Sequence, residues 1–390
     1  MKLRKMGKIL PALCIALLFA LIAAGCGPAE TPKTMLELNQ EYSALTVFES
    51  SGGINMDITL SDTVNDMVGG ELQPILDLFK QMTYSSKSDA VNMSADATVL
   101  SGGNELFHVV MDGPGEAYYM DMTGLIDAMK NIDASGAPSG FDFFPEELEA
   151  DLQGNQWVKI NFPDSSVYVA ARELIADYML GLDNEVFTNF DSGFVKAISG
   201  GYEFKVTYEQ LGPYIQALGT YVLENLDAFV SYTKTFLQGL TEEQLDSIGL
   251  TADMRDEAIA GLDDLAAPEN KALYESSLAS AVSTIQMPDI ASILGGSYID
   301  LKLTKSGETF TWAYDFLINL NFEGSSLGAL FGVDFGNNAI RITVDEQTKP
   351  IDSFTPEIPT SSIIDAEDTE YFAGVDLGLG SAFDPYAFGY

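Results

Sequence analysis

The sequence has few of the residues that enzymes use most often for nucleophilic and metal-assisted chemistry. It contains one histidine, His108, and two cysteines, Cys14 and Cys26. This scarcity excludes His/Cys zinc sites and the Ser-His-Asp or Cys-His nucleophile systems that need a second histidine. His108 lies in a strand-like run, where a lone histidine is more often packed or at a sheet surface than catalytic.

Basic side chains are also few. The chain has 19 Lys and Arg against 58 Asp and Glu, a net charge of −39 at pH 7. Such a charge repels nucleic acid and anionic lipid head groups, so we expect neither as a partner. A solvated acidic surface that keeps the chain soluble is the simplest interpretation.

Several motifs that mark catalytic or ion-binding sites are missing. The sequence has no Gly-rich phosphate loop and no GxSxG motif, and its acidic runs at residues 183–185 and 334–338 lack the spacing of a calcium loop. We therefore expect no metal site, no cofactor and no enzymatic activity. Acid-only hydrolysis by a carboxylate pair is the one enzymatic chemistry that so many acidic residues leave open.

Long hydrophobic runs are absent except near the start of the chain. Lys2, Arg4, Lys5 and Lys8 precede an apolar run from Ile9 to Ala24, which is shorter than the ~20 apolar residues of a spanning helix. A basic start, an apolar run and small residues are the layout of a secretory signal, which predicts a signal peptide over residues 1–25. An uncleaved anchor and a plain secretory signal are the two alternatives.

The residues Leu21-Ile-Ala-Ala-Gly-Cys26 resemble the lipobox of bacterial lipoproteins. That resemblance implies cleavage before Cys26, which then carries a diacylglyceryl group with palmitate as its acyl chain. Two acyl chains hold a protein on a bilayer far better than one. We expect a lipoprotein anchored through Cys26 to the extracytoplasmic face of the cell membrane, with residues 26–33 as a Pro-containing tether.

Hydrophobic periodicity predicts the elements of the body. The strongest strand signal is the period-two apolar row over residues 309–321. Gly52-Gly53 is interpreted as a break before a strand, and Gly307 as the turn between two strands. We expect helices at 34–48, 71–81 and 125–132 and through most of 167–286, and strands at 54–60, 91–99, 106–111, 117–122, 156–162, 200–208, 298–305, 309–321 and 339–345.

The order of these elements is similar to the LolA/LppX-like superfamily of periplasmic and surface lipoproteins. The similarity lies in a lead helix, a long strand, a meander that ends at Tyr118-Tyr119, and Trp157-Val-Lys159. It implies an α+β fold in which a curved antiparallel sheet, an incomplete barrel, wraps helices around an apolar cavity. We expect one domain over 34–355 with a helical insertion at about 208–290, and a disordered acidic, aromatic tail over 356–390.

This fold would bring apolar strand rows together around a bound ligand. We predict binding of a hydrophobic ligand, with lipid as the favoured class, in a space closed by the helix that runs from Leu218 to Phe229. The same rows would also suit an ordinary packed core with methionine as a gap filler. The alternative function is a cell-surface scaffold that captures a cell-envelope protein through Tyr371, Phe372, Phe383, Tyr386, Phe388 and Tyr390. The candidate lining residues are Ile54, Met56, Ile58, Met93, Tyr118, Met120, Met122, Trp312, Tyr314 and Phe316.

Overall fold

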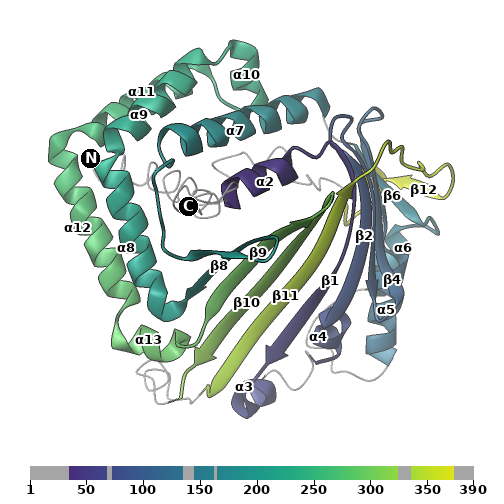
Figure 1. Ribbon diagram of the computed structural model, residues 1–390. Coiled ribbons are helices and arrows are strands. Elements are labelled where there is room, and N and C mark those ends of the chain that lie inside the picture. The colour runs from purple at the N-terminus through teal and green to yellow at the C-terminus, as the bar shows by residue number, and fades with distance from the viewer. Residues whose placement is uncertain (1–34, 68–72, 135–144, 162–164, 324–334, 373–390) are drawn as a thin grey trace.

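Twelve strands form one curved sheet in the order β12-β6-β5-β4-β3-β2-β1-β11-β10-β9-β8-β7 (Figure 1). The computed structural model describes residues 35–67, 73–134, 145–161, 165–323 and 335–372. All neighbouring strands are antiparallel except β12 and β6, and the end strands β12 and β7 do not pair, so the barrel is unclosed. The strands are β1 (Val47–Thr59), β2 (Gln81–Asp89), β3 (Ser94–Ser101), β4 (Asn104–Asp112), β5 (Ala117–Asp121), β6 (Trp157–Asn161), β7 (Val195–Ile198), β8 (Gly201–Thr207), β9 (Tyr298–Ser306), β10 (Thr309–Asn321), β11 (Asn337–Pro350) and β12 (Ile363–Asp365).

The sheet consists of two meanders that follow the chain in order. Strands β1–β6 form one and β7–β11 the other, and the two join where β1 pairs with β11. Helix α7 (Ser165–Glu185) connects the β6 edge to the β7 edge. The expected α+β class with a curved antiparallel sheet is confirmed.

Two groups of helices accompany the sheet. The first group lies before α7: α2 (Met35–Ser43), α3 (Asp62–Met67), α4 (Gln73–Phe79), α5 (Thr123–Ala134) and α6 (Pro145–Asp151). The second lies between β8 and β9, which pair with each other, so these helices leave and re-enter the sheet at adjacent strands. They are α8 (Tyr208–Glu224), α9 (Leu226–Gly239), α10 (Glu242–Ser247), α11 (Ala252–Ala266), α12 (Pro268–Ile285) and α13 (Pro288–Leu294).

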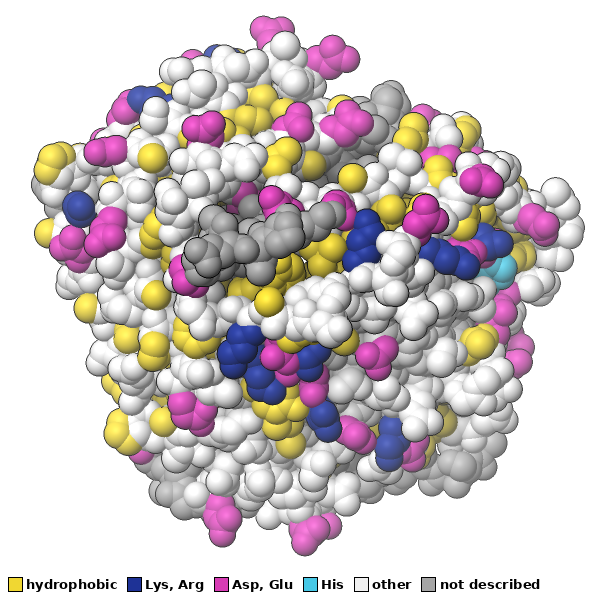
Figure 2. Space-filling model, viewed as in Figure 1, with side chains coloured by type: hydrophobic (Ala, Val, Ile, Leu, Met, Phe, Trp, Pro, Cys, Tyr) yellow, Lys and Arg dark blue, Asp and Glu magenta, His cyan; other side chains and the backbone are white. Residues whose placement is uncertain are grey.

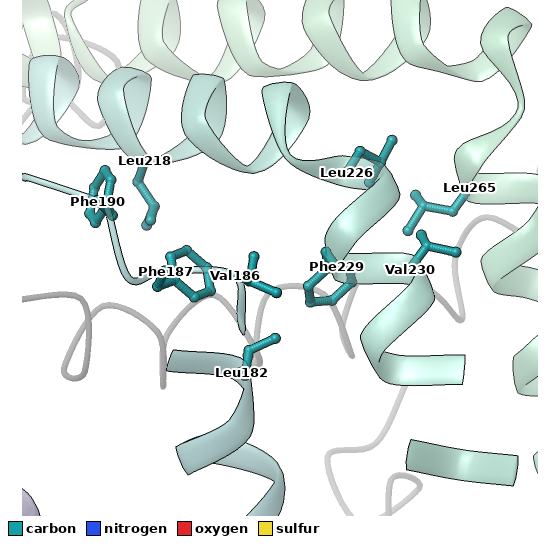
Figure 3. Packing of buried hydrophobic residues seen from close by; sticks show 9 residues of the cluster. All are labelled: Leu182, Val186, Phe187, Phe190, Leu218, Leu226, Phe229, Val230 and Leu265. Carbon is teal, nitrogen blue, oxygen red and sulfur yellow. The ribbon is translucent and has the colours of Figure 1, made fainter. Parts of the chain in front are cut away.

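The helices of the second group have a core of their own. Leu218 and Phe229, expected to close a cavity over the sheet, instead belong to a buried cluster with Leu182 of α7 and the residues that follow it (Figure 3). The single helix expected from Leu218 to Phe229 is divided between α8 and α9, because the chain departs from helical geometry at Asn225. The predicted closure of the cavity by one helix is therefore wrong.

Several local predictions also differ from the structure. The lead helix ends at Ser43, because β1 begins at Val47. Gly52 and Gly53 lie inside β1 rather than before it. Strands β2 and β7 were not expected, since β2 contains three serines and a lysine with only two large apolar or aromatic side chains and β7 is short.

The two faces of the sheet differ in chemistry. One face carries the apolar rows described below. The other, which we call the outer face, carries ion pairs between neighbouring strands, and Figure 2 shows Lys and Arg side chains over the strands beside acidic ones. The shortest contacts of these pairs are Arg341–Asp315 at 2.8 Å, Lys205–Asp300 at 2.9 Å, Lys302–Glu203 at 3.0 Å and Lys349–Glu49 at 2.7 Å.

The described part of the expected disordered tail is folded. Residues 363–365 form β12, and Ile364 is buried in a cluster with Ile126 and Val158. The Tyr371 hydroxyl donates to Glu147 at 2.6 Å, and Phe372 packs on the same cluster. The prediction of disorder from residue 356 is therefore wrong as far as residue 372. Short apolar segments in this part of the chain pair with the edge of the sheet and pack into a hydrophobic cluster. Residues 373–390, with the other four tail aromatics, lie outside the described residues.

Candidate ligand-binding face

Three strands bring apolar side chains together on the inner face, the face opposite the ion pairs. Residues directly opposite each other in an antiparallel pair point to the same side of the sheet. Strand β11 lies between β10 and β1, so Val344, Ile342 and Ile340 each have one apolar neighbour on either side. The three rows are Tyr314–Val344–Ile54, Phe316–Ile342–Met56 and Ile318–Ile340–Ile58.

The inner face passes from buried to exposed along β10. Phe310 and Trp312 are 2% and 5% exposed and pack with Met35 and Leu38 of α2. Figure 1 shows α2 between this end of the sheet and α7. Farther along, Phe316 is half-buried and Ile318 is 48% exposed.

The exposed end extends sideways to β9, where Ile299, the partner of Phe316, is 40% exposed. In the described part of the chain, Phe316, Ile342 and Met56 belong to none of the five buried clusters. We call the nine residues of the three rows the open apolar face. Ile318 is exposed and the other eight are half-buried, so solvent reaches this contiguous apolar surface in part. Contiguous apolar surface marks a binding site more often than scattered single residues do.

A carboxylate stands where the open apolar face meets the buried core. Glu346 is the inward residue of β11 next to Val344, and it lies directly opposite Trp312 and Gly52. One of its oxygens, Oε1, accepts from the Tyr42 hydroxyl at 2.9 Å and from Thr348 Oγ1 at 2.8 Å. The other, Oε2, accepts from the Tyr84 hydroxyl at 2.8 Å.

Gly52 makes room for this cluster. A Cβ atom at Gly52 would lie 2.1 Å from the carbonyl oxygen of Asp345 and 2.9 Å from the Tyr84 ring. The ring of Tyr84, on β2, therefore lies against the bare backbone of β1, and its hydroxyl reaches the carboxylate on β11. A glycine inside a strand commonly marks such a close approach.

The tyrosines around Glu346 remain neutral donors. Burial first, and then the charge of Glu346, raises the pKa of Tyr42 to about 12. Burial and the same carboxylate also raise the pKa values of Tyr84 and Tyr314. At physiological pH the hydroxyls of Tyr42 and Tyr84 can therefore donate to the carboxylate without competing ionisation.

Six of the ten predicted lining residues lie on the inner side of β1 and β10. Five of them belong to the open apolar face, whereas Trp312 is buried in the cluster beneath α2 and does not line it. Ile54, Met56 and Ile58 come from β1, and Trp312, Tyr314 and Phe316 from β10. The alternation of β11 could have identified Ile340, Ile342 and Val344 as well. No local sequence pattern indicated the roles of Tyr42, Tyr84 and Glu346, because the three residues come from separate elements.

The other four predicted residues lie elsewhere. Tyr118 and Met120 are on the same face but in β5, where Tyr118 packs on the cluster that contains Ile126 of α5. Met122 follows β5, and its carbonyl accepts from the Ile126 N–H at the start of α5. Met93 lies in the turn before β3 with φ +48°, although a strand was expected over residues 91–99.

The single histidine is on the outer face. His108 Nε2 is 2.9 Å from Asp96 Oδ1, and its ring packs edge-on against Trp157. Within the described residues no group of three or more His, Cys, Asp and Glu side chains could hold a metal ion. A polar hollow of about 510 Å³ over β1, β2 and β11 is lined mainly by serines, Lys87 and Lys349, and none of these residues forms a nucleophile–base pair.

Comparisons with family models, with curated proteins and with solved structures return no match for this chain. Among the described helices, none has the length and apolar composition needed to cross a membrane. The site is therefore interpreted from its own geometry.

Proposed function

We propose that the protein is a membrane-anchored extracytoplasmic lipoprotein that binds a membrane lipid on the open apolar face, without catalysis. The observation that carries this proposal is the continuous set of half-buried and exposed apolar side chains on β10, β11 and β1, beside α2. A cell-surface scaffold has less support, because Tyr371 and Phe372 pack on the protein's own body.

The dimensions and chemistry of the face suit an acyl chain. Strand β11 from Glu346 to Ile340 spans about 20 Å at the usual rise per residue. One leaflet of a bilayer holds chains over about 15 Å, half of its ~30 Å hydrocarbon core. Each methylene removed from water contributes about 0.8 kcal/mol, so a chain on this face gains several kcal/mol in free energy of binding.

The finer fold assignment is also a proposal. A curved, unclosed antiparallel sheet with a lead helix against one face is the arrangement that the LolA/LppX-like resemblance implies. In that superfamily the inner face shields acyl chains. A lipid anchor would keep such a carrier beside its lipid source.

A charge placed on the open face should abolish lipid binding. Ile342→Asp puts a carboxylate in the middle of the three rows, where it would lose its hydration beneath an acyl chain. Thr343→Asp is the matched control, because Thr343 is the next residue on the same strand and faces the other way. Native mass spectrometry of gently purified protein should show co-purifying lipid on wild type and Thr343→Asp and none on Ile342→Asp. Lipid retained by Ile342→Asp, or absent from wild type, would contradict the proposal.

The membrane anchor has a separate test. Cys26 lies outside the described residues, so its lipidation rests on the lipobox alone. We expect the wild-type protein to partition into the detergent phase and Cys26→Ser to stay in the aqueous phase. Unchanged partitioning of Cys26→Ser would show that the attached lipid is not the anchor.

A further inference from the structure

Glu346 is a charged group at the end of an apolar surface, and its described partners are all hydroxyls. It receives hydrogen bonds from Tyr42, Tyr84 and Thr348. None of the ion pairs among the described residues includes Glu346. On the outer face, by contrast, four of the acidic side chains have lysine or arginine partners. The inner face therefore holds a negative charge that no described cation neutralises.

The hydrogen bonds around this carboxylate leave room for one more donor. A carboxylate offers about four acceptor positions on its two oxygens. Two hydroxyls occupy Oε1, and Tyr84 occupies one position on Oε2. The remaining position on Oε2 can accept an N–H, and a cationic N–H also supplies the missing charge.

The residue opposite Glu346 does not occupy the remaining acceptor position. The indole Nε1 of Trp312, which is 5% exposed, has no hydrogen-bond partner among the described residues. An indole N–H only donates, so it requires an oxygen acceptor. Trp312 and Glu346 are direct partners across β10 and β11, yet the indole N–H does not donate to the carboxylate, so the remaining position on Oε2 stays open.

We infer that the bound lipid carries an ammonium N–H group in its head, and that Glu346 binds this group while the acyl chain lies over Val344, Ile342 and Ile340. This inference rests on the proposed lipid-binding function and adds the class of head group. A zwitterionic lipid with a primary ammonium fits this site, because its head supplies both the N–H donor and the positive charge. An anionic head group without an ammonium would be repelled by Glu346.

The test compares two soluble probes with the same chain. Decylammonium and decyl maltoside, each below its micellar concentration, are titrated calorimetrically into wild type, Glu346→Gln and Asp345→Asn. Glu346→Gln keeps an oxygen acceptor and removes the charge. Asp345→Asn is the matched control, since it removes the same charge from the next residue of β11, whose side chain is on the opposite face.

We expect Glu346→Gln to weaken decylammonium binding about tenfold, the order of one partly exposed charged hydrogen bond, and to leave decyl maltoside binding unchanged. Asp345→Asn should change neither affinity. An unchanged decylammonium affinity in Glu346→Gln, or an equal loss in Asp345→Asn, would overturn the head-group inference while leaving acyl-chain binding in place. If neither probe binds wild type, the proposed function fails, and the head-group inference fails with it.

Discussion

Phe310→Ala is expected to destabilise the protein by about 3–5 kcal/mol, the usual cost of truncating a buried phenylalanine. Phe316→Ala, on the same strand and the same face, should cost about 1 kcal/mol. Phe310 is 2% exposed in the cluster beneath α2, whereas Phe316 is half-buried on the open apolar face. Urea unfolding followed by far-ultraviolet circular dichroism measures both values.

Comparing the free energies of unfolding of Phe310→Ala and Phe316→Ala tests whether the inner face is one packed core or a packed core next to a binding surface. Phe316→Ala should also reduce the amount of co-purifying lipid, because the stack of Tyr314 and Phe316 (ring centroids 6.2 Å apart) is part of the surface that a chain would cover. A cost for Phe316→Ala as large as that for Phe310→Ala would mean that both rings are packed alike, and that no open face exists.

Gly52→Ala is expected to cost at least about 2 kcal/mol, although alanine adds a single methyl group. That methyl would lie 2.1 Å from the backbone carbonyl of Asp345, which cannot move without disturbing the β1–β11 pairing. It would also displace the Tyr84 ring and weaken its hydrogen bond to Glu346. Denaturant midpoints determined for both glycine variants test this expectation.

Gly53→Ala is the natural control for that experiment. Its methyl would meet only the carbonyl oxygen of Met82, at 3.7 Å, which is an ordinary contact. We expect the cost of Gly53→Ala to stay within about 0.5 kcal/mol, because the alanine fits without strain. Equal effects of the two substitutions would show that the Tyr84 ring does not lie on Gly52.

The sequence was most informative where the pattern is local and repeated. The period-two row of β10 and the turn at Gly307 follow from short stretches of chain, and the bounds of β10 match the prediction. Such features depend on side-chain periodicity and backbone conformation, which neighbouring residues largely determine.

Features that depend on distant partners were missed. The pairing of β1 with β11 joins residues about 290 positions apart, and no local pattern specifies its register. Gly52 was interpreted as a break because its reason for being glycine is the Tyr84 ring on another strand. β2 was missed because serines occupy positions that a core strand would fill with larger apolar side chains.

The candidate site also combines features that local sequence patterns predict with features that depend on distant residues. The alternating residues of β1 and β10 indicated an apolar surface, but the strand between them was not included in it. The carboxylate at its end acquires its environment from α2, β2 and β11 together. Residues that predictably alternate could be found from the sequence, whereas a polar cluster assembled from three elements could not.

The central claim is that lipid chains bind the inner face of the sheet, and the two tryptophans of the chain allow a direct test. Trp312 lies on the inner face, stacked on Tyr314 with ring centroids 5.3 Å apart. Trp157 lies on the outer face, in the row that contains His108 and Asp121. Each substitution to phenylalanine, Trp157→Phe or Trp312→Phe, leaves one reporter.

The measurement is fluorescence quenching of each single-tryptophan protein by a lipid whose acyl chains carry bromine. We expect the lipid to quench Trp312 in the Trp157→Phe protein and to leave Trp157 in the Trp312→Phe protein unaffected, with lipid binding by both proteins checked by native mass spectrometry. Equal quenching of the two tryptophans, or quenching of Trp157 alone, would contradict binding on the inner face.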